Sequence, residues 1–464
     1  MTSRQKAILF LIVDFITAAI VWFLFYIYRI KTVEHTEVVF KGNFYTGLIA
    51  LPFFWILLYT IQGTYHNIKE NYRLKTIKHT LYGTLMGCIL IFFAFVLNDY
   101  VSVYTQFYTL LLVFIGLHFT ITLIPRFIFT TIYVKRIHKG IIGFDTIIIG
   151  GSNRALEVLE DINSLKQKSG YNFIGYVNIN GTDTLLSDKL PYLGHIDNIH
   201  DILKNNKVER AIIALESSDH ERLKGIITEL APYDIKISTI PDAYDILAGQ
   251  LKMNSIFGAL LLDVTPSIMP DWQFSTKRLI DIGVSLIALI VLIPFYITVG
   301  IIVKTTSKGP VFFTQERIGK HGKKFNIIKF RTMVQNAEKN GPQLSSSEDK
   351  RITGIGKFLR KTRFDEFPQF WNVLIGDMSL VGPRPERQYY IDKIAAKDPQ
   401  YLYLHKVRPG ITSWGQVKFG YAENVEQMVQ RMKYDLLYIR NMSLALDFKI
   451  MFYTIAIIFK GAGK

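Results

Sequence analysis

Four long apolar stretches lie in the first 139 residues, at 7–28, 44–61, 80–97 and 104–124. Each is about long enough for one α-helix to cross a bilayer, so the pattern predicts a block of four transmembrane helices over 1–139. The first stretch is too long for the core of a typical signal peptide and has no clear small-residue cleavage site. We therefore expect it to be a retained helix.

Charged residues around these stretches predict how the block is oriented. Lysine and arginine are concentrated after the second stretch and after the fourth, whereas the other two loops are mixed or acidic. The positive-inside rule then puts both ends of the block in the cytoplasm. Asp14 is the only charged residue inside the first stretch. A charge at such a position is either a functional site or a buried partner of a neighbouring helix.

A different pattern begins near residue 140. A β-branched run at 144–149 is followed by Gly150 and Gly151 and a helical segment, and further strands are predicted at 210–215 and 235–240. Alternation of strands and helices predicts a parallel sheet, and so a Rossmann-like α/β module over 140–247. The glycine spacing departs from Gly-x-Gly-x-x-Gly, so we expect a module without bound NAD. A linker is predicted at 248–276.

The apolar run at 279–303 is long enough to span a membrane, and Asp281 is its only charged residue. Pro294 lies past the midpoint, where it removes a helical hydrogen bond and bends the helix. Both ends are flanked by basic residues, which favours both in the cytoplasm. These features favour a re-entrant helix, which enters and leaves the same leaflet, over a proline-kinked fifth span. The flanking residues are Lys277, Arg278, Lys304 and Lys308.

The segment 360–386 holds an adjacent acid pair, Asp365 and Glu366, preceded by basic residues and followed by a turn-rich run. A carboxylate beside arginines is expected to keep a low pKa and stay ionised, so it can act as a nucleophile or a metal ligand. Arginines at fixed spacing suit phosphate binding. The alternative is a surface cluster of salt bridges.

The net charge of +16 indicates that the protein has an anionic partner. Excess lysine and arginine indicates nucleic acid, anionic lipid or a phosphorylated substrate. The sequence has no zinc-finger spacing and no RNA-binding aromatic signature, so we expect no nucleic acid partner. Its ten histidines show no paired metal spacing, and its single cysteine, Cys88, excludes a disulfide within the chain.

The motif Asp-Glu-x-Pro-Gln-x-x-Asn-Val-x-x-Gly-Asp-Met-Ser-Leu-Val-Gly-Pro-Arg-Pro at 365–385 resembles the signature of the bacterial sugar transferases, the monotopic phosphoglycosyl transferases. The resemblance runs from about Lys277 to the C-terminus, and the upstream chain resembles the long form of the family. It implies a membrane protein with α and α/β parts, in which a monotopic catalytic domain with a re-entrant helix covers 277–464. One departure, Arg363-Phe364 in place of the more frequent Ser-Leu, bears on sugar preference more than on chemistry.

The activity that the resemblance implies is transfer of a sugar-1-phosphate from a UDP-sugar to polyprenyl (undecaprenyl) phosphate, with release of UMP. This would be the first membrane step of exopolysaccharide, capsule or O-antigen assembly. Asp365 is implied to form a covalent phosphosugar intermediate, and Glu366 to hold Mg²⁺. Arg360 and Arg384 are implied to bind phosphates. Three more basic residues either line a phosphate path or are solvated charges: Arg317, Lys329 and Arg331.

Alternatives remain at several points. Asp377 is a weaker candidate metal ligand, or a cap of its turn. The protein could instead be a catalytically inactive, membrane-anchored regulatory or binding protein of the same pathway. A transporter is disfavoured, because the conspicuous charges lie outside the predicted spans.

We expect a multi-pass protein of the bacterial inner membrane with its catalytic domain on the cytoplasmic face. Its expected partners are a UDP-sugar, polyprenyl phosphate and membrane lipid, and a homo-oligomer is left open. Three further segments have predicted structures: a polar loop at 340–349, a turn at 408–412 like the family's second motif, and an interfacial helix at 446–459.

Overall fold

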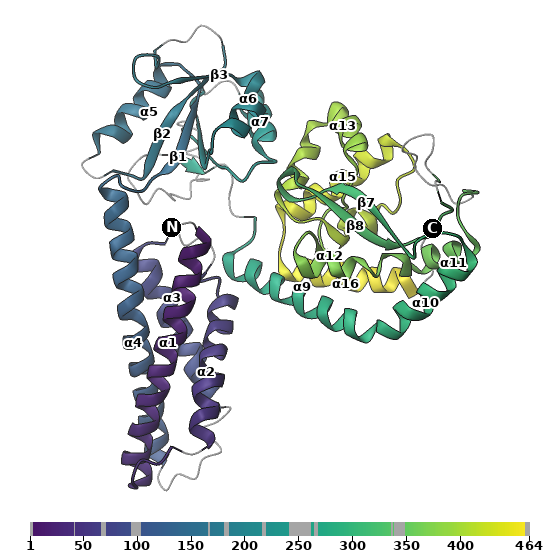
Figure 1. Cartoon of the computed structure of the whole chain (residues 1–464). Coiled ribbons are helices and arrows are strands. Elements are labelled where there is room, and N and C mark those ends of the chain that lie inside the picture. Colours follow the sequence, from purple (N-terminus) through teal and green to yellow (C-terminus); the bar gives the residue numbers. More distant parts are fainter. Residues whose placement is uncertain are drawn as a thin grey trace. The chain divides into compact units, whose positions relative to one another are not determined.

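The computed structural model describes residues 3–40, 42–65, 71–93, 104–165, 168–180, 185–215, 220–240, 261–263, 268–335, 337 and 349–459. The chain forms two compact units (Figure 1). The first contains Met1–Ile142 with Pro270–Lys277, and the second contains Gly143–Met269 with Arg278–Lys464. The N-terminal helices and the acid pair therefore belong to different units.

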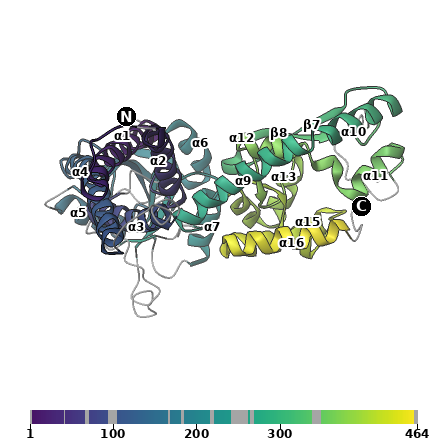
Figure 2. The ribbon, with the colours of Figure 1, turned by 90° about the horizontal axis from the view of Figure 1, so that it is seen from below.

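Helices are present at all four predicted apolar stretches of the first unit: α1 (Ser3–Arg29), α2 (Gly42–Ile61), α3 (Arg73–Ile91) and α4 (Tyr104–His138). They lie around a common axis in Figure 2, with α1 packed against α2 and α4, and α3 packed against α4. A π-helical turn, η1 (Ile30–Glu34), continues α1.

Three of these helices, α1, α2 and α4, are long and apolar enough to cross a membrane. The helix α3 is not among them, since its first two turns carry three basic residues. The end of the third predicted stretch, 94–97, lies outside the described residues. The helix α4 extends to His138, well past the predicted end at 124, with Pro125 inside it.

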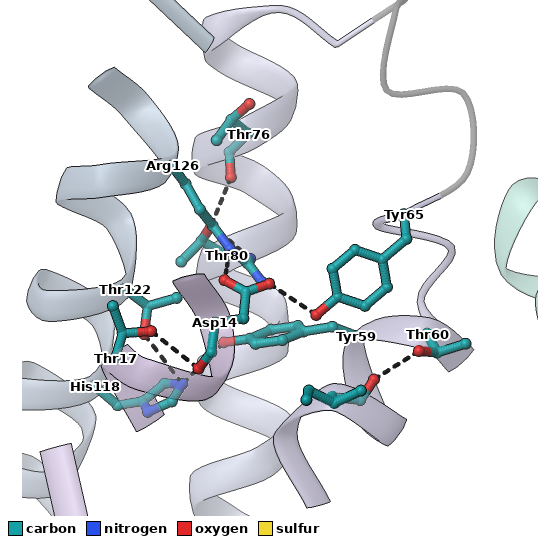
Figure 3. Close-up of polar contacts among 11 residues, drawn as sticks. Asp14, Thr17, Tyr59, Thr60, Tyr65, Thr76, Thr80, His118, Thr122 and Arg126 are labelled. Atoms are coloured by element: carbon teal, nitrogen blue, oxygen red, sulfur yellow. Dashed lines mark hydrogen bonds and ion pairs between the residues drawn. The ribbon is translucent and has the colours of Figure 1, made fainter. Parts of the chain in front are cut away.

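Asp14 on α1 and Arg126 on α4 form a buried ion pair between helices (Figure 3). Arg126 donates from Nε to Asp14 Oδ1 at 2.7 Å and from Nη2 to Asp14 Oδ2 at 2.6 Å. The Tyr65 hydroxyl, just after α2, also donates to Asp14 Oδ2 at 2.8 Å, and Arg126 Nη1 donates to Thr80 on α3 at 3.2 Å. Of the two alternatives for Asp14, the partner on a neighbouring helix is confirmed.

The ion pair is enclosed by further polar and aromatic contacts. The Arg126 guanidinium lies over the Tyr59 ring, 3.9 Å from its centroid. Tyr59 in turn bonds His118 Nε2 at 2.8 Å, and the His118 ring stacks on Trp55 at 3.5 Å between centroids. Residues on or next to all four helices thus meet at one charge pair, and its hydrogen bonds require these helices to lie side by side.

We expect replacement of Arg126 alone to destabilise the bundle strongly, because Asp14 would remain buried without its counter-ion. The cost for Arg126→Leu should be about 3–5 kcal/mol, whereas the double variant Asp14→Leu/Arg126→Leu should lose much less. Unfolding in detergent, followed by tryptophan fluorescence, measures both. If the single variant is as stable as the wild type, the pair does not hold the bundle together.

The second unit begins with a six-stranded sheet in the order β3-β2-β1-β4-β5-β6. The strands β1 (Phe144–Ile149), β2 (Tyr171–Asn178), β3 (Tyr192–His195), β4 (Arg210–Ile213) and β5 (Lys236–Thr239) are parallel, and β6 (Leu262–Asp263) is antiparallel. The connecting helices are α5 (Asn153–Ser164), η4 (Ile196–Asn198), α6 (Ile199–Asn205) and α7 (His220–Leu230). The order of the parallel strands is that of doubly wound α/β folds.

This sheet confirms the predicted parallel α/β module, and it extends further along the chain than expected. The strand β1 is buried on both sides, as its unbroken β-branched run predicts. The strand β6 lies within the predicted linker 248–276 and pairs with β5. Whether the module binds a nucleotide stays a prediction.

A bent pair of helices follows, α9 (Asp271–Val291) and α10 (Ile293–Thr306), with an angle of 61° between them. The predicted bend is confirmed, and Pro294 lies in the first turn of α10, where its missing N–H costs nothing. Both helices expose large apolar side chains. These side chains are Leu286, Ile287, Ile290, Val291, Ile293, Ile297 and Ile301.

The rest of the unit surrounds an antiparallel hairpin, β7 (Phe312–Ile318) and β8 (Lys324–Phe330). Its other elements are η5 (Lys320–Gly322), α11 (Gly354–Thr362), η6 (Phe364–Glu366), α12 (Gln369–Ile375), β9 (Ser379–Val381), α13 (Gln388–Lys397), η7 (Pro399–Lys406), β10 (Gly410–Thr412), α14 (Trp414–Lys418), α15 (Val425–Arg440) and α16 (Leu444–Phe459). The helix α16 matches the predicted helix at 446–459. Of the predicted loop at 340–349, residues 340–348 lie outside the described part.

Two glycines in the resemblance motifs have a structural explanation. The strands β9 and β10 pair in parallel, and a side chain at Gly382 or Gly410 would collide with the facing backbone. The predicted turn at 408–412 therefore forms part of a close backbone contact with the Gly-Pro-Arg-Pro segment.

Candidate active site

The acid pair lies on a short 3-10 turn between two helices. Thr353 caps the start of α11, and the helix ends at Arg363, whose left-handed backbone (φ 58°) redirects the chain into η6. Asp365 and Glu366 occupy η6 and are only 8% and 6% exposed. The acid pair is therefore buried, and the predicted alternative of a surface salt-bridge cluster is wrong.

Cations from two other elements converge on Glu366. Lys329 on β8 donates to Glu366 Oε1 at 2.6 Å, and Arg384 Nη1, in the turn after β9, lies 3.6 Å from the same oxygen. By contrast, no hydrogen bond or ion pair holds the Asp365 carboxylate among the residues that the structure describes. The two acids are adjacent in sequence but have different surroundings.

Arg360 approaches the pair from α11. Its Nε donates to Thr332 Oγ1 at 2.9 Å, which fixes the guanidinium beside the acid pair. The Arg360 charge acts to lower the pKa of Asp365, together with those of Lys329 and Arg384. Three of the five basic residues singled out in the sequence are thus gathered around the acids.

The other two, Arg317 and Arg331, are engaged elsewhere. Arg317 donates to Glu386 Oε2 at 3.1 Å and to the Pro385 carbonyl at 3.0 Å, which holds the Gly-Pro-Arg-Pro segment against β7. Arg331 donates to the carbonyls of Ser307 and Lys308, at 2.8 and 3.0 Å, just beyond α10. These contacts are structural, and a phosphate-binding role for either arginine stays a prediction.

The buried environment gives the two acids different pKa values. Burial raises the pKa of Asp365 to about 6, against the opposing charge of Lys329. Burial also disfavours the charge on Glu366, but Lys329 and Arg384 outweigh it and lower the pKa of Glu366 to about 2. The expected low pKa is therefore correct for Glu366 and wrong for Asp365, because Asp365 is desolvated without a partner of its own.

The frame around the pair depends on contacts that sequence patterns did not reveal. Asn372 on α12, 1% exposed, accepts from the Ile328 amide at 3.1 Å and donates to the Asn326 carbonyl at 2.8 Å. It ties α12 to β8 directly beside Lys329. At the other end of α12, Arg278 donates to the Val373 carbonyl at 2.7 Å. The motif had marked Asn372, but its partners lie far away in the sequence.

The acid pair is a suitable donor set for Mg²⁺. Among the described residues there is no group of three histidine, cysteine or acidic side chains that could hold a metal. Mg²⁺, however, commonly takes one or two carboxylates and completes its coordination with substrate phosphates. Asp377 is not part of the pair's surroundings, since it lies at the far end of α12, where its amide bonds the Asn372 carbonyl.

We expect Asp365→Asn to stabilise the folded protein at pH 7.5. Since the folded-state pKa of about 6 lies above the ordinary value of 3.8, ionisation of Asp365 opposes folding as pH rises from about 4 to 6. Above that window the variant should gain roughly 2–3 kcal/mol, and below it the gain should vanish. Denaturant unfolding at several pH values tests this, with Asp377→Asn as control. A variant less stable than the wild type at pH 7.5 would contradict the burial argument.

Two known protein families match successive parts of the chain. The bacterial sugar transferase model matches residues 272–461, and a CoA-binding domain model matches residues 61–241. An Aeromonas hydrophila UDP-N-acetylgalactosamine-undecaprenyl-phosphate N-acetylgalactosaminephosphotransferase is 42% identical over 229 residues, 49% of this chain and 53% of its own length. The match thus spans about half of that relative.

Two further relatives extend the comparison. A Caulobacter vibrioides UDP-glucose:undecaprenyl-phosphate glucose-1-phosphate transferase is 38% identical over 183 residues, 39% of this chain and 68% of its own length. A Salmonella typhimurium undecaprenyl-phosphate galactose phosphotransferase is 28% identical over 446 residues, 91% of this chain and 87% of its own length. The chain belongs to the bacterial sugar transferase family, in its long form.

Proposed function

We propose that this protein transfers a sugar-1-phosphate from a UDP-sugar to undecaprenyl phosphate and releases UMP. The observation that carries the proposal is the buried acid pair with unequal surroundings, in which Glu366 is held by Lys329 and Arg384 while Asp365 is unpaired among the described residues. The names of the relatives support the substrate class, and they differ in the sugar, which is N-acetylgalactosamine, glucose or galactose. We therefore propose that the transferred sugar is a hexose, without specifying which one.

The reaction would proceed in two steps through Asp365. A carboxylate oxygen attacks the β-phosphorus, a new O–P bond forms, and the bond to the α-phosphate oxygen breaks, so that UMP leaves. An oxygen of the lipid phosphate then attacks the same phosphorus and the Asp365 carboxylate departs. This route separates the two anionic substrates in time. With a pKa of about 6, Asp365 is mostly ionised at neutral pH, and no described residue pairs with it in competition with the substrate.

The charged groups around Asp365 would serve the phosphates. The anionic phosphates and the Asp365 carboxylate would otherwise repel one another. Positive charge from Lys329, Arg384 and Arg360 offsets this repulsion. Glu366, kept ionised by its cations, is the residue to hold Mg²⁺ beside Asp365. When bound, that ion would offset the negative charge of the phosphates.

We also propose that α9 and α10 form a re-entrant pair that enters and leaves one leaflet. From Arg278 onward the pair is bonded to the second unit on both sides of the bend. In α9, Arg278 bonds α12, and Asp281 accepts from the Leu380 amide at 3.0 Å. Beyond α10, Arg331, directly after β8, bonds the Ser307 and Lys308 carbonyls. A crossing span would have to place these two ends on opposite sides of the membrane.

This topology supports placement in the bacterial inner membrane, with the catalytic unit on the cytoplasmic face where nucleotide sugars are made. An inactive regulatory protein is the rival function, and the assembled acids and cations give it no support. UMP release from a panel of UDP-hexoses, with undecaprenyl phosphate and Mg²⁺, decides between the two.

Asp365→Asn should lower turnover by about 10³-fold or more, because the amide cannot form the phosphosugar intermediate. Asp377→Asn, at the far end of α12, should keep most of the activity and serves as the control. UMP release measures both. An Asp365→Asn variant that retains most of its rate would exclude nucleophilic catalysis by this residue.

The same proposal predicts the order of events. A pulse of UDP-sugar and Mg²⁺ without lipid should add a sugar-phosphate mass to the peptide that contains Asp365, and initial-rate plots should be parallel. Glu366→Gln should impair formation of the adduct through loss of the metal. Intersecting plots without an adduct would instead favour direct attack by the lipid phosphate.

The re-entrant pair predicts that both of its ends are cytoplasmic. Single cysteines from Thr276→Cys and Lys308→Cys, in a Cys88→Ser background, should both resist an impermeant thiol reagent in intact cells. Both should react after the membrane is opened. Reaction of only the Lys308→Cys site in sealed cells would establish a fifth span.

A further inference from the structure

Arg363 has an uncommon backbone conformation at the entrance to the acid pair. Its φ of 58° and ψ of 18° lie in the left-handed region, which side chains with a Cβ rarely adopt. Two backbone hydrogen bonds maintain the turn, from the Arg363 amide to the Arg360 carbonyl and from the Glu366 amide to the Arg363 carbonyl, both 3.2 Å. The position would suit glycine or asparagine better than arginine.

The side chain is buried, yet no residue that the structure describes accepts a hydrogen bond from its guanidinium or forms an ion pair with it. Arg363 is 8% exposed, and its Nε is enclosed without a hydrogen-bond acceptor. None of the ion pairs among the described residues includes it. An unpaired buried charge costs several kcal/mol, so the arrangement is incomplete without an acceptor.

Other cations of this unit donate to protein groups. Lys329 and Arg384 pair with Glu366, and Arg431 pairs with Glu386 at 2.6 Å. Arg331 donates to backbone carbonyls through its terminal nitrogens, although its Nε, like that of Arg317, lacks an acceptor among the described residues. Arg363 differs from both, because no described protein group accepts from any of its guanidinium nitrogens.

Tyr421 places Arg363 in the same cluster as the acids. The Arg363 Cζ lies 5.2 Å from the centroid of the Tyr421 ring, and the Arg384 Cζ lies 6.0 Å from the same centroid. Since Arg384 also contacts Glu366, the ring links the unsatisfied cation to the acid pair. A cation over an aromatic face is oriented without using its hydrogen-bond donors.

We infer that Arg363 binds the phosphoryl group that is transferred, through guanidinium donors that no described protein group accepts. The inference rests on the proposed function. Asp365, two residues further along the same turn, must contact the phosphorus that it attacks, so the oxygens of this group come within the cluster that Arg363 shares with Glu366. A phosphate oxygen supplies both the charge and the acceptors that the guanidinium lacks.

Two substitutions distinguish the role of the Arg363 side chain from that of its backbone conformation. Arg363→Gly removes the guanidinium and favours the left-handed conformation, so its unfolding midpoint should equal or exceed that of the wild type. Arg363→Lys keeps the charge and loses the planar fork. Lys361→Gln removes an exposed cation two residues away and is the matched control.

Binding of UDP and UMP to full-length protein in detergent, with Mg²⁺, provides a readout that needs no turnover. UDP carries the β-phosphate that corresponds to the transferred group, and UMP lacks it. Arg363→Gly should lower the affinity for UDP roughly ten- to hundredfold and the affinity for UMP by much less. The affinities of Arg363→Lys should be intermediate. Lys361→Gln should leave both unchanged. Added methylguanidinium should restore part of the UDP affinity of Arg363→Gly.

Other outcomes would overturn the inference. Equal losses for UDP and UMP would assign Arg363 to the nucleoside or its α-phosphate. Unchanged binding of both, with a raised KM for undecaprenyl phosphate, would assign it to the lipid phosphate. If Arg363→Gly does not fold, an Arg363→Lys variant with wild-type UDP affinity would count against it. A wild type that neither binds UDP nor releases UMP would overturn the proposed function itself. This result is distinct from those that overturn only the inference about Arg363.

Discussion

The buried ion pair between Lys329 and Glu366 joins the strand β8 to the turn η6, and the geometry of the site depends on it. Asn372 adds α12 to the same frame by bonding the β8 backbone at Asn326 and Ile328, just before the lysine. In this low-dielectric setting a charge is tolerated only when its partner is held in place. Glu366 meets that condition, whereas Asp365 lacks a protein partner in the described structure. The chemical difference between two neighbouring acids is therefore a product of packing.

A similar constraint organises the N-terminal bundle. Asp14 and Arg126 are 112 residues apart in sequence, yet each supplies the hydrogen-bonding capacity that the other requires. Apolar side chains alone tolerate many relative rotations of helices in lipid, because lipid and side chains are equally apolar. One bidentate pair removes most of that freedom. The network around it, which includes Thr80 and Tyr65, extends the restriction to the other two helices.

Much of the architecture could be predicted from local pattern. Apolar runs marked the helices of the bundle, a β-branched run marked β1, and Pro294 marked the break between α9 and α10. Tertiary contacts could not be predicted in this way. Lys329 and Arg331 are two residues apart at the end of β8, yet one binds Glu366 and the other binds carbonyls beyond α10. The raised pKa of Asp365 likewise depends on burial, which no spacing of charges reveals.

The catalytic unit bonds the bent helix pair on both sides of its bend, at Arg278 in α9 and just beyond α10, and this has a consequence for the surrounding lipid. The helix α10 has 14 residues and is ~21 Å long, whereas the hydrocarbon of one leaflet is ~15 Å thick. On the proposed topology α10 must therefore lie oblique to the membrane normal. Because the helix pair is held by Arg278 in α9 and by Arg331 beyond α10, a thinner leaflet would tilt the catalytic unit with it. Acyl-chain length would then set the height at which the acid pair meets a lipid phosphate.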